Sequence, residues 1–252
     1  MDVAALIAVA VAAGWVDAVV GGGGLLLIPA LLIGMPGLAP ATALGTNKLA
    51  AIFGTASAAW RYSRSVRLDA ARLAPVFGCA VVCSGLGALV ASSLPTRVFT
   101  PVVLALLVAV GLFVALRPDF GAHTVGVRSR TSVIAGLAIA AVVIAFYDGL
   151  LGPGTGTFLI VTVTALVGTG FLESSAMAKV VNTGTNLGAL AVFAVQGNVL
   201  WLLGIGLAVG NVVGAQIGSR MALRHGSGFV RWVLLVVVVV MVARLTYQLV
   251  AG

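Results

Sequence analysis

Long apolar runs limit what this chain can fold into more than any other feature of its sequence. Of its 252 residues, 61% are hydrophobic and 8% are charged, and the mean hydropathy is +1.21. That composition leaves too little polar surface for a soluble globular protein. The runs lack the alternation of barrel strands, and a helix satisfies its own backbone polar groups in lipid. We therefore predict an all-α integral membrane protein.

Two glycine-rich segments interrupt the apolar sequence, WVDAVVGGGGLLLIP at 15–29 and FYDGLLGPGTGTF at 146–158. Three residues of the first recur in the second, each 131 positions later (148 − 17 = 131): Asp17 as Asp148, Gly21 as Gly152 and Gly23 as Gly154. Charged, broken segments that occur twice in an apolar chain are typical of a transporter site between two repeats.

The whole order of apolar segments also repeats. The predicted segments of the first half are 3–20, 25–34, 41–60, 74–91 and 101–116, and those of the second half are 132–151, 155–167, 174–195, 200–221 and 229–250. Segment 25–34 would rise only ~15 Å, about half the thickness of the hydrocarbon layer, so we expect a half-helix there. Each half thus holds about four full helices, or five segments when broken and half-helices are counted. We divide the chain into a first transmembrane repeat (1–117), a basic cytoplasmic linker (118–130) and a second transmembrane repeat (131–252).

Arginine positions predict how the halves lie in the membrane. In the first half the arginines follow the third segment, whereas in the second half they follow the fourth, and the net charge of +8 reflects these loops rather than a nucleic-acid site. Because arginines favour the cytoplasmic side, the halves should be inverted relative to each other, with an odd number of crossings each. Five crossings, or three plus a hairpin of the first two segments, satisfy this. Both termini should lie outside a bacterial-type plasma membrane, in a multi-pass protein.

The only two lysines, Lys48 and Lys179, are also 131 positions apart. Charges at membrane depth are costly unless paired or hydrated. Two interpretations stay open. In one, Asp17 pairs with Lys48 and Asp148 with Lys179, as structural ion pairs within each half. In the other, the lysines and the backbone N–H groups that begin segments 25–34 and 155–167 attract an anion, while an aspartate takes up or releases a proton.

The second interpretation defines a candidate site. The residues expected to bind substrate are Gly21, Gly22, Gly23, Gly24, Asn47, Lys48, Gly152, Gly154, Thr155, Lys179, Asn182 and Asn186. Asp17 and Asp148 are expected to couple transport or to form ion pairs. Hydrogen bonding between helices is the alternative role for the asparagines. We expect no catalytic residues, no metal and no cofactor; Cys79 and Cys83 are read as small buried residues, and Trp15, Trp60, Tyr62 and Trp201 as anchors at the membrane surface.

The order of several short motifs resembles that of a known family. GGGGLLLIP, then ALGTNK, then GPGTGTFL with AMAKVVNTGTNLGAL is similar to the TauE/SafE-type sulfite exporters, also called four-transmembrane-domain duplication permeases. The resemblance covers nearly the whole chain. It implies a secondary transporter that exports small sulfur-containing anions such as sulfite or organosulfonates, with protons as a coupling ion. Its partners would be that anion, protons and the lipid bilayer.

Other classes of function share some of these features. A passive anion channel, or a partner in an assembly that does not itself transport, would share the composition. An intramembrane aspartyl protease would also place two aspartates in the membrane, but it needs a Gly-x-Gly-Asp motif, which the sequence lacks. No nucleotide-binding loop is present, so direct ATP drive is not expected. The sequence predicts a transporter and not an enzyme.

Overall fold

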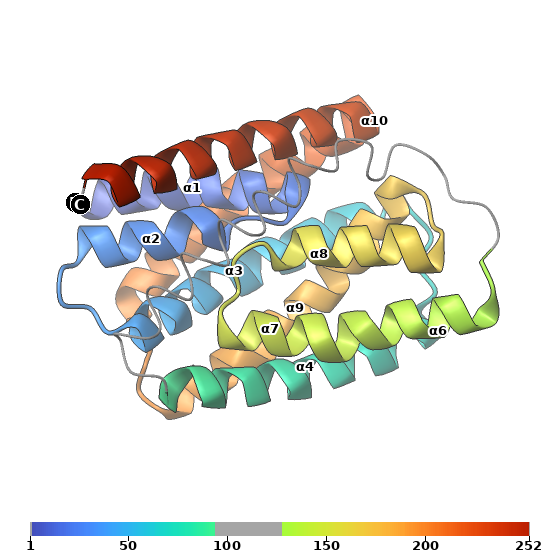
Figure 1. The fold of residues 1–252 in the computed structure, drawn as a ribbon, viewed down its shortest axis with the longest axis horizontal. Coiled ribbons are helices and arrows are strands. Elements are labelled where there is room, and N and C mark those ends of the chain that lie inside the picture. The colour runs from blue at the N-terminus through green and yellow to red at the C-terminus, as the bar shows by residue number, and fades with distance from the viewer. Residues whose placement is uncertain (1, 94–127, 252) are drawn as a thin grey trace.

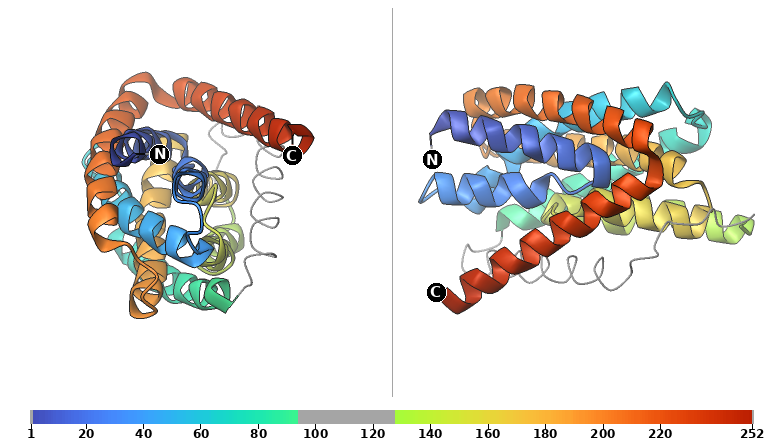
Figure 2. Two further views of the ribbon diagram at one scale, coloured as in Figure 1. Left: turned by 90° about the vertical axis from the view of Figure 1, so that its left-hand side faces the viewer. Right: turned by 90° about the horizontal axis from the view of Figure 1, so that it is seen from above.

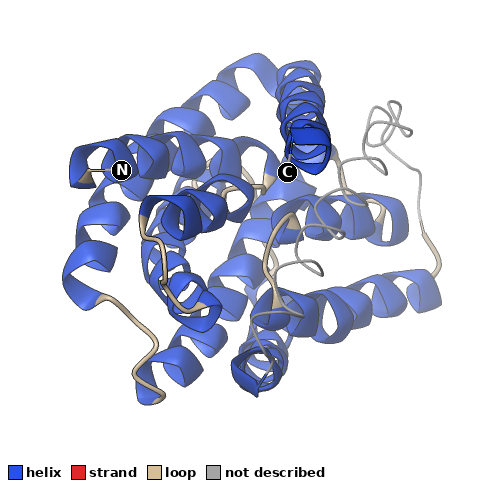
Figure 3. Ribbon diagram, turned by 60° about the vertical axis from the view of Figure 1, so that its left-hand side comes forward, coloured by secondary structure: helices blue, strands red, loops and turns tan. Residues whose placement is uncertain are grey.

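The computed structural model describes residues 2–93 and 128–251, and all of their regular structure is helical (Figures 1 and 3). The elements are α1 (Val3–Val20), α2 (Gly24–Gly34), α3 (Pro40–Ser63), α4 (Ala70–Ser93), α6 (Arg130–Ala138), the π-helical η1 (Ile139–Ile144), α7 (Ala145–Leu150), α8 (Thr155–Thr162), the π-helical η2 (Val163–Val167), α9 (Phe171–Val195) and α10 (Trp201–Ala251). The predicted segment 101–116 and most of the predicted linker 118–130 lie outside the described residues.

Four helical stretches are long and apolar enough to cross a membrane, which confirms the prediction of an all-α membrane protein. They are Val3–Val20, Ala70–Ser93, Arg130–Leu150 and Trp201–Gly226. Helices α3 and α9 have 24 and 25 residues, a spanning length. They are less apolar because they carry the buried lysines and asparagines. Helix α2 and the stretch Thr155–Val167 are the short segments that the sequence predicted.

The first two helices form a hairpin, and so do their counterparts in the second half. Helix α2 returns alongside α1, while α8 and η2 return alongside the continuous stretch from α6 to α7 (Figure 1). The open ends of the two hairpins lie at opposite ends of the molecule, and their tips meet in its interior (Figure 1). The first two segments of each half are therefore antiparallel neighbours, and the first of them is long enough to cross a membrane.

Helix α10 departs from the predicted segments. We expected separate segments at 200–221 and 229–250, but the helix continues from one to the other with a single break at Gly226, where φ is 72° and ψ is −163°. At this break the chain folds back, so the start of α1 and the end of α10 lie at the same end of the molecule (Figure 2). A residue without a Cβ can adopt this left-handed φ at little cost, so one glycine replaces a loop.

Each half of the chain packs mainly against the other half. Helix α10 lies against α1 and α3, and α4 lies against α7 and α9. Gly210, Gly214 and Gly218 form one stripe of α10 that contacts the backbone of α1 so closely that a side chain at Gly214 would collide with the carbonyl of Val11. In lipid such small-residue stripes let helix backbones approach and gain dispersion contacts. The two halves are therefore interlocked and do not lie side by side as separate bodies.

Candidate functional site

The first glycine-rich break ends helix α1 and begins α2. Gly21 is left-handed, with φ of 83°, and its N–H donates to the carbonyl of Asp17 at 2.8 Å. A left-handed glycine after the last turn is a common way to end a helix. The N–H of Gly23 points back to the Asp17 carboxylate, with 3.3 Å between the nitrogen and Oδ1. The break therefore turns one backbone donor, the N–H of Gly23, toward the one acidic side chain of α1.

The second break joins α7 to α8 by a different local structure. Gly152 and Gly154 both have positive φ, 86° and 79°, and Gly154 directly precedes α8. The hydroxyl of Tyr147 donates to the carbonyl of Pro153 at 2.6 Å and fixes the loop from outside. The hydroxyl of Thr155 lies 2.6 Å from Oδ1 of Asp148. The carboxylate of Asp148 thus accepts a hydrogen bond from a side-chain hydroxyl, whereas the carboxylate of Asp17 accepts one from a backbone N–H.

The two breaks touch each other. The N–H of Gly156 donates to the carbonyl of Gly21 at 3.0 Å, and the hydroxyl of Thr157 donates to the carbonyl of Val20 at 2.8 Å. A side chain at Gly21 would collide with the backbone of Gly156, so the close approach requires glycine at both positions. These bonds also satisfy carbonyls at the end of α1 that have no partner within the helix.

Both buried ion pairs connect one half of the chain to the other. Nζ of Lys48 lies 2.7 Å from Oδ2 of Asp148, and Nζ of Lys179 lies 3.2 Å from Oδ2 of Asp17. Lys179 also donates to the backbone carbonyl of Asp17. The predicted pairing within each half, Asp17 with Lys48 and Asp148 with Lys179, is therefore wrong. Because the hairpin tips cross, each aspartate meets the lysine-bearing helix of the opposite half.

The four charged side chains are almost completely removed from solvent. Side-chain exposure is 2% and 3% for Lys48 and Asp148, and 0% and 12% for Lys179 and Asp17. Removing two opposite charges from water costs several kcal/mol per ion, roughly balanced by their attraction only when further polar groups complete the coordination. The Thr155 hydroxyl and the Gly23 N–H supply such groups. The site can therefore hold one negative charge at each lysine in a dry environment.

The other predicted site residues divide into those beside the ion pairs and those away from them. A Cβ placed on Gly24 would lie 3.7 Å from Nδ2 of Asn47 and 3.9 Å from the carbonyl oxygen of Gly152, so these three residues meet. A Cβ on Gly152 would lie 3.2 Å from Nζ of Lys48. Gly22, by contrast, faces the side chains of Leu25 and Val16.

The asparagines of α9 lie buried between helices. Oδ1 of Asn182 accepts from the Thr185 hydroxyl at 3.1 Å, and Nδ2 of Asn186 lies 3.4 Å from the Thr55 hydroxyl of α3. Thr55 and Asn186 are themselves 131 positions apart, so equivalent positions of the two halves face each other. These contacts are hydrogen bonds within and between helices, the alternative role that the sequence left open.

Some residues near the site were misjudged or missed from sequence. Tyr62, expected at the membrane surface, is fully buried and donates its hydroxyl to the carbonyl of Ala18, close to Asp17. Asn211 of α10 was not considered, yet it is buried and packs tightly against Gly54 of α3. The sequence does indicate this residue, because Asn211 is the first amide side chain in the apolar run after Trp201. Cys79 and Cys83 are partly exposed, not buried, with their sulfurs 3.9 Å apart.

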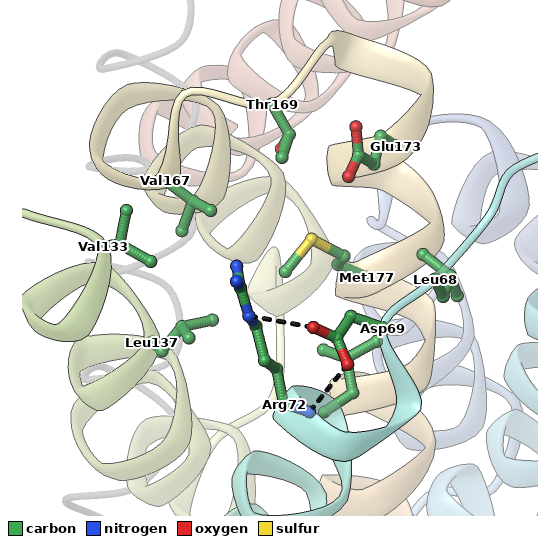
Figure 4. Close-up of a pocket in the computed structure, with 10 residues that line it drawn as sticks. Leu68, Asp69, Arg72, Val133, Leu137, Val167, Thr169, Glu173 and Met177 are labelled. Atoms are coloured by element: carbon green, nitrogen blue, oxygen red, sulfur yellow. Dashed lines mark hydrogen bonds and ion pairs between the residues drawn. The ribbon is translucent and has the colours of Figure 1, made fainter. Parts of the chain in front are cut away.

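A pocket of about 380 Å³, part of it open space, lies at the end of the molecule where α4, α6 and α9 begin (Figure 4). Arg72 enters it from α4 and pairs with Asp69 at 2.9 Å, while Glu173 and Met177 line it from α9 (Figure 4). Lys179 is two residues beyond Met177 on α9, so its side chain points to another face of the helix. Among the described residues, no group of three or more His, Cys, Asp or Glu side chains could hold a metal ion.

Comparisons with known proteins agree on one family. The family model described as "Sulfite exporter TauE/SafE" matches residues 6–245. The chain is 37% identical over 233 residues to the "Probable membrane transporter protein ORF9" of Sinorhizobium sp, covering 92% of this chain and 88% of that protein. It is 33% identical to a "Probable membrane transporter protein" of Haemophilus influenzae, covering 97% and 94%. It is 34% identical to the "Probable membrane transporter protein YfcA" of Escherichia coli K12, covering 95% and 88%. No solved structure matches.

Proposed function

The chain belongs to the TauE/SafE sulfite exporter family and is a membrane transporter, and from this premise we propose that it exports a small sulfur-containing anion, such as sulfite or an organosulfonate, with protons as the coupling ion. One observation carries the proposal. Each of the two lysines is buried at the crossing of the hairpins, and the group that neutralises it is a carboxylate from the other half. A carboxylate is chemically close to a sulfite or sulfonate oxyanion, so each aspartate holds the place that a substrate anion would take.

The same geometry supports coupling to protons. An anion that displaces Asp17 from Lys179 would leave a carboxylate without a cation in a dry environment. Such a group is stabilised by taking up a proton. The anion and the proton would then move in the same direction, as an electrically neutral pair, and return of the aspartate to its lysine would release both. The gradient of the anion itself would set the net direction toward export.

An inverted repeat would give the two lysines equivalent tasks on opposite sides. The opposite open ends of the hairpins, the exchange of helix partners between halves and the contact of Thr55 with Asn186 support this arrangement. We propose that the end carrying the α3–α4 loop faces the cytoplasm, because its arginines follow the positive-inside rule. Both termini would then lie outside the plasma membrane.

The two other classes of function make different demands on the site. In a protease of the dyad type two carboxylates share a proton, whereas here each aspartate contacts a lysine. A passive channel needs a continuous path, and this site is closed around buried ion pairs. Both observations favour a carrier that rearranges during each cycle.

The decisive experiment separates a structural ion pair from a transport site. The variant Lys48→Met with Asp148→Leu removes both charges but keeps the volume, so the fold should be retained. We expect counterflow of labelled sulfite or sulfonate in proteoliposomes to fall at least tenfold, because both charged groups at one lysine site are lost. A matched control, Arg67→Met, changes an exposed loop cation and should leave counterflow unchanged.

Counterflow at the wild-type rate in the folded double variant would show that this pair is structural and would remove Lys48 from the proposal. A channel would conduct the anion without counterflow. Proton coupling has its own test. If Asp17→Asn and Asp148→Asn both leave the proton dependence of transport unchanged, the coupling step must be abandoned while the anion site stands.

A further inference from the structure

Three arginines gather where α3 and α10 reach the arginine-rich end of the molecule. Nε of Arg61 donates to Oε1 of Gln216 at 2.7 Å, and Nε2 of Gln216 donates to the carbonyl of Ser57 at 3.1 Å. Gln216 therefore holds Arg61 in place across the two helices. Arg64, one turn further along α3, and Arg220, one turn further along α10, lie within electrostatic range of Arg61.

None of these arginines pairs with an acid among the described residues. The ion pairs there join Lys48 to Asp148, Lys179 to Asp17 and Arg72 to Asp69. Arg61 is thus held near two like charges by an amide and not by a carboxylate. Repulsion between the three positive charges is unfavourable, and their proximity concentrates positive electrostatic potential at this surface. The surface therefore favours the binding of an external anion.

An exposed apolar strip leads up to the arginines along the same two helices. Helices α3 and α10 run in the same direction, with Gly54 against Asn211 and Ser57 against Gln216. This register sets Phe53 close to the level of Val209 and sets Trp60 about one turn beyond Gln216, toward Arg220. Phe53, Trp60 and Val209 are 52%, 57% and 64% exposed. Cζ of Arg64 lies 5.1 Å from the centre of the Trp60 ring, which joins the strip to the charges.

The order of these groups matches one kind of occupant. Along the two helices, apolar side chains come first, then a tryptophan, then the arginines. A phospholipid presents its parts in the same order: acyl chains, the interfacial region and the phosphate. We propose that this surface, named the α3–α10 seam and made of Phe53, Trp60, Arg61, Arg64, Val209 and Arg220, binds one anionic phospholipid such as phosphatidylglycerol. The site depends only on insertion in a bilayer, so it is independent of the substrate of transport.

Native mass spectrometry of the purified full chain in neutral detergent tests the seam. Phosphatidylglycerol should bind more tightly than phosphatidylcholine. The variant Arg61→Gln with Arg220→Gln should weaken phosphatidylglycerol binding roughly thirtyfold, at about fivefold for each arginine near the headgroup. The matched control, Arg128→Gln with Arg130→Gln, removes two exposed charges at the same end but away from the seam, and should retain wild-type affinity.

Arg61 also donates to Gln216, so its substitution could disturb the packing of α3 and α10. A second variant separates that effect from the loss of lipid binding. Arg64→Gln changes an exposed residue outside the Arg61–Gln216–Ser57 hydrogen bonds, and it should weaken lipid binding about fivefold. Equal weakening in the Arg128 and Arg130 control, or equal binding of phosphatidylcholine, would overturn the proposal. Displacement of the lipid by millimolar inorganic phosphate would identify a free-phosphate site and would overturn it as well.

Discussion

The two buried ion pairs contain the same residue types at the same spacing, yet their surroundings differ. At Lys48 and Asp148 the nitrogen and oxygen are 2.7 Å apart, and the Thr155 hydroxyl lies beside the carboxylate. At Lys179 and Asp17 the distance is 3.2 Å, and a backbone N–H takes the place of the hydroxyl. Position 155 corresponds to Gly24 in the first half (155 − 131 = 24), so the duplication has kept the charges but changed the groups around them.

This difference suggests a division of labour between the pairs. Asp17 is the more exposed of the two carboxylates, with a side-chain exposure of 12% against 3% for Asp148. Asp148 is held by both a cation and a hydroxyl. We therefore expect an incoming anion to displace Asp17 from Lys179 more readily than it displaces Asp148 from Lys48.

Removing either lysine should destabilise the protein strongly, and Lys48 should matter more. Lys48→Met leaves Asp148 charged and buried without its cation, which costs about 3–5 kcal/mol. Lys179→Met should cost less, because Asp17 is partly exposed and can be hydrated. Unfolding of the purified variants in denaturing detergent measures both. Equal or reversed costs would contradict the asymmetry.

Glycines on the two sides of the first break should respond very differently to alanine. At Gly21 the left-handed φ and the contact with Gly156 both oppose a side chain, so Gly21→Ala should cost about 1–3 kcal/mol or more and separate the hairpin tips. At Gly24 a Cβ would make only ordinary contacts, at 3.5 Å from Ile28. Gly24→Ala should therefore be nearly neutral in thermal stability. A loss at Gly24 as large as that at Gly21 would mean that the breaks do not meet as described.

The Thr155 hydroxyl at the second break should stabilise the protein by the free energy of one hydrogen bond to a charged group. Thr155→Val keeps the shape but removes the donor to Asp148, so we expect a loss of about 1.5–3 kcal/mol. The substitution should also make Asp148 easier to displace and so reduce the difference between the two pairs. Transport assays with each lysine substituted in the Thr155→Val background would measure that change. No loss of stability would show that the hydroxyl does not support the carboxylate.

Tyr62 gives the smallest expected effect. Its hydroxyl satisfies the carbonyl of Ala18, and the corresponding position in the second half is Phe193, which has no hydroxyl. Tyr62→Phe should cost about 1 kcal/mol and leave the Asp148 pair unaffected. Thermal stability in detergent, with Phe193→Leu as a packing control, checks this expectation.

Much of the fold could be predicted from the sequence because lipid imposes simple rules on helices. The bounds of α1 and of the stretch 155–167 agree with the predicted segments, since glycine and proline end the apolar runs there. The partner of each lysine could not be predicted in this way. Spacing shows that Asp17 and Lys48 belong to one half, but only the crossing of the hairpin tips brings Asp17 to Lys179. The burial of Tyr62 and the π-helical turns also depend on packing between halves, which leaves no local signal.

Double-mutant cycles on the four buried charges test whether each aspartate pairs with the lysine of the other half. Each of the four charged residues is neutralised singly and in pairs, and the free energy of unfolding is measured for every variant. We predict coupling of more than about 1 kcal/mol between Lys48 and Asp148 and between Lys179 and Asp17, with almost none between Lys48 and Asp17. Strong coupling within a half, and none across the halves, would contradict the account.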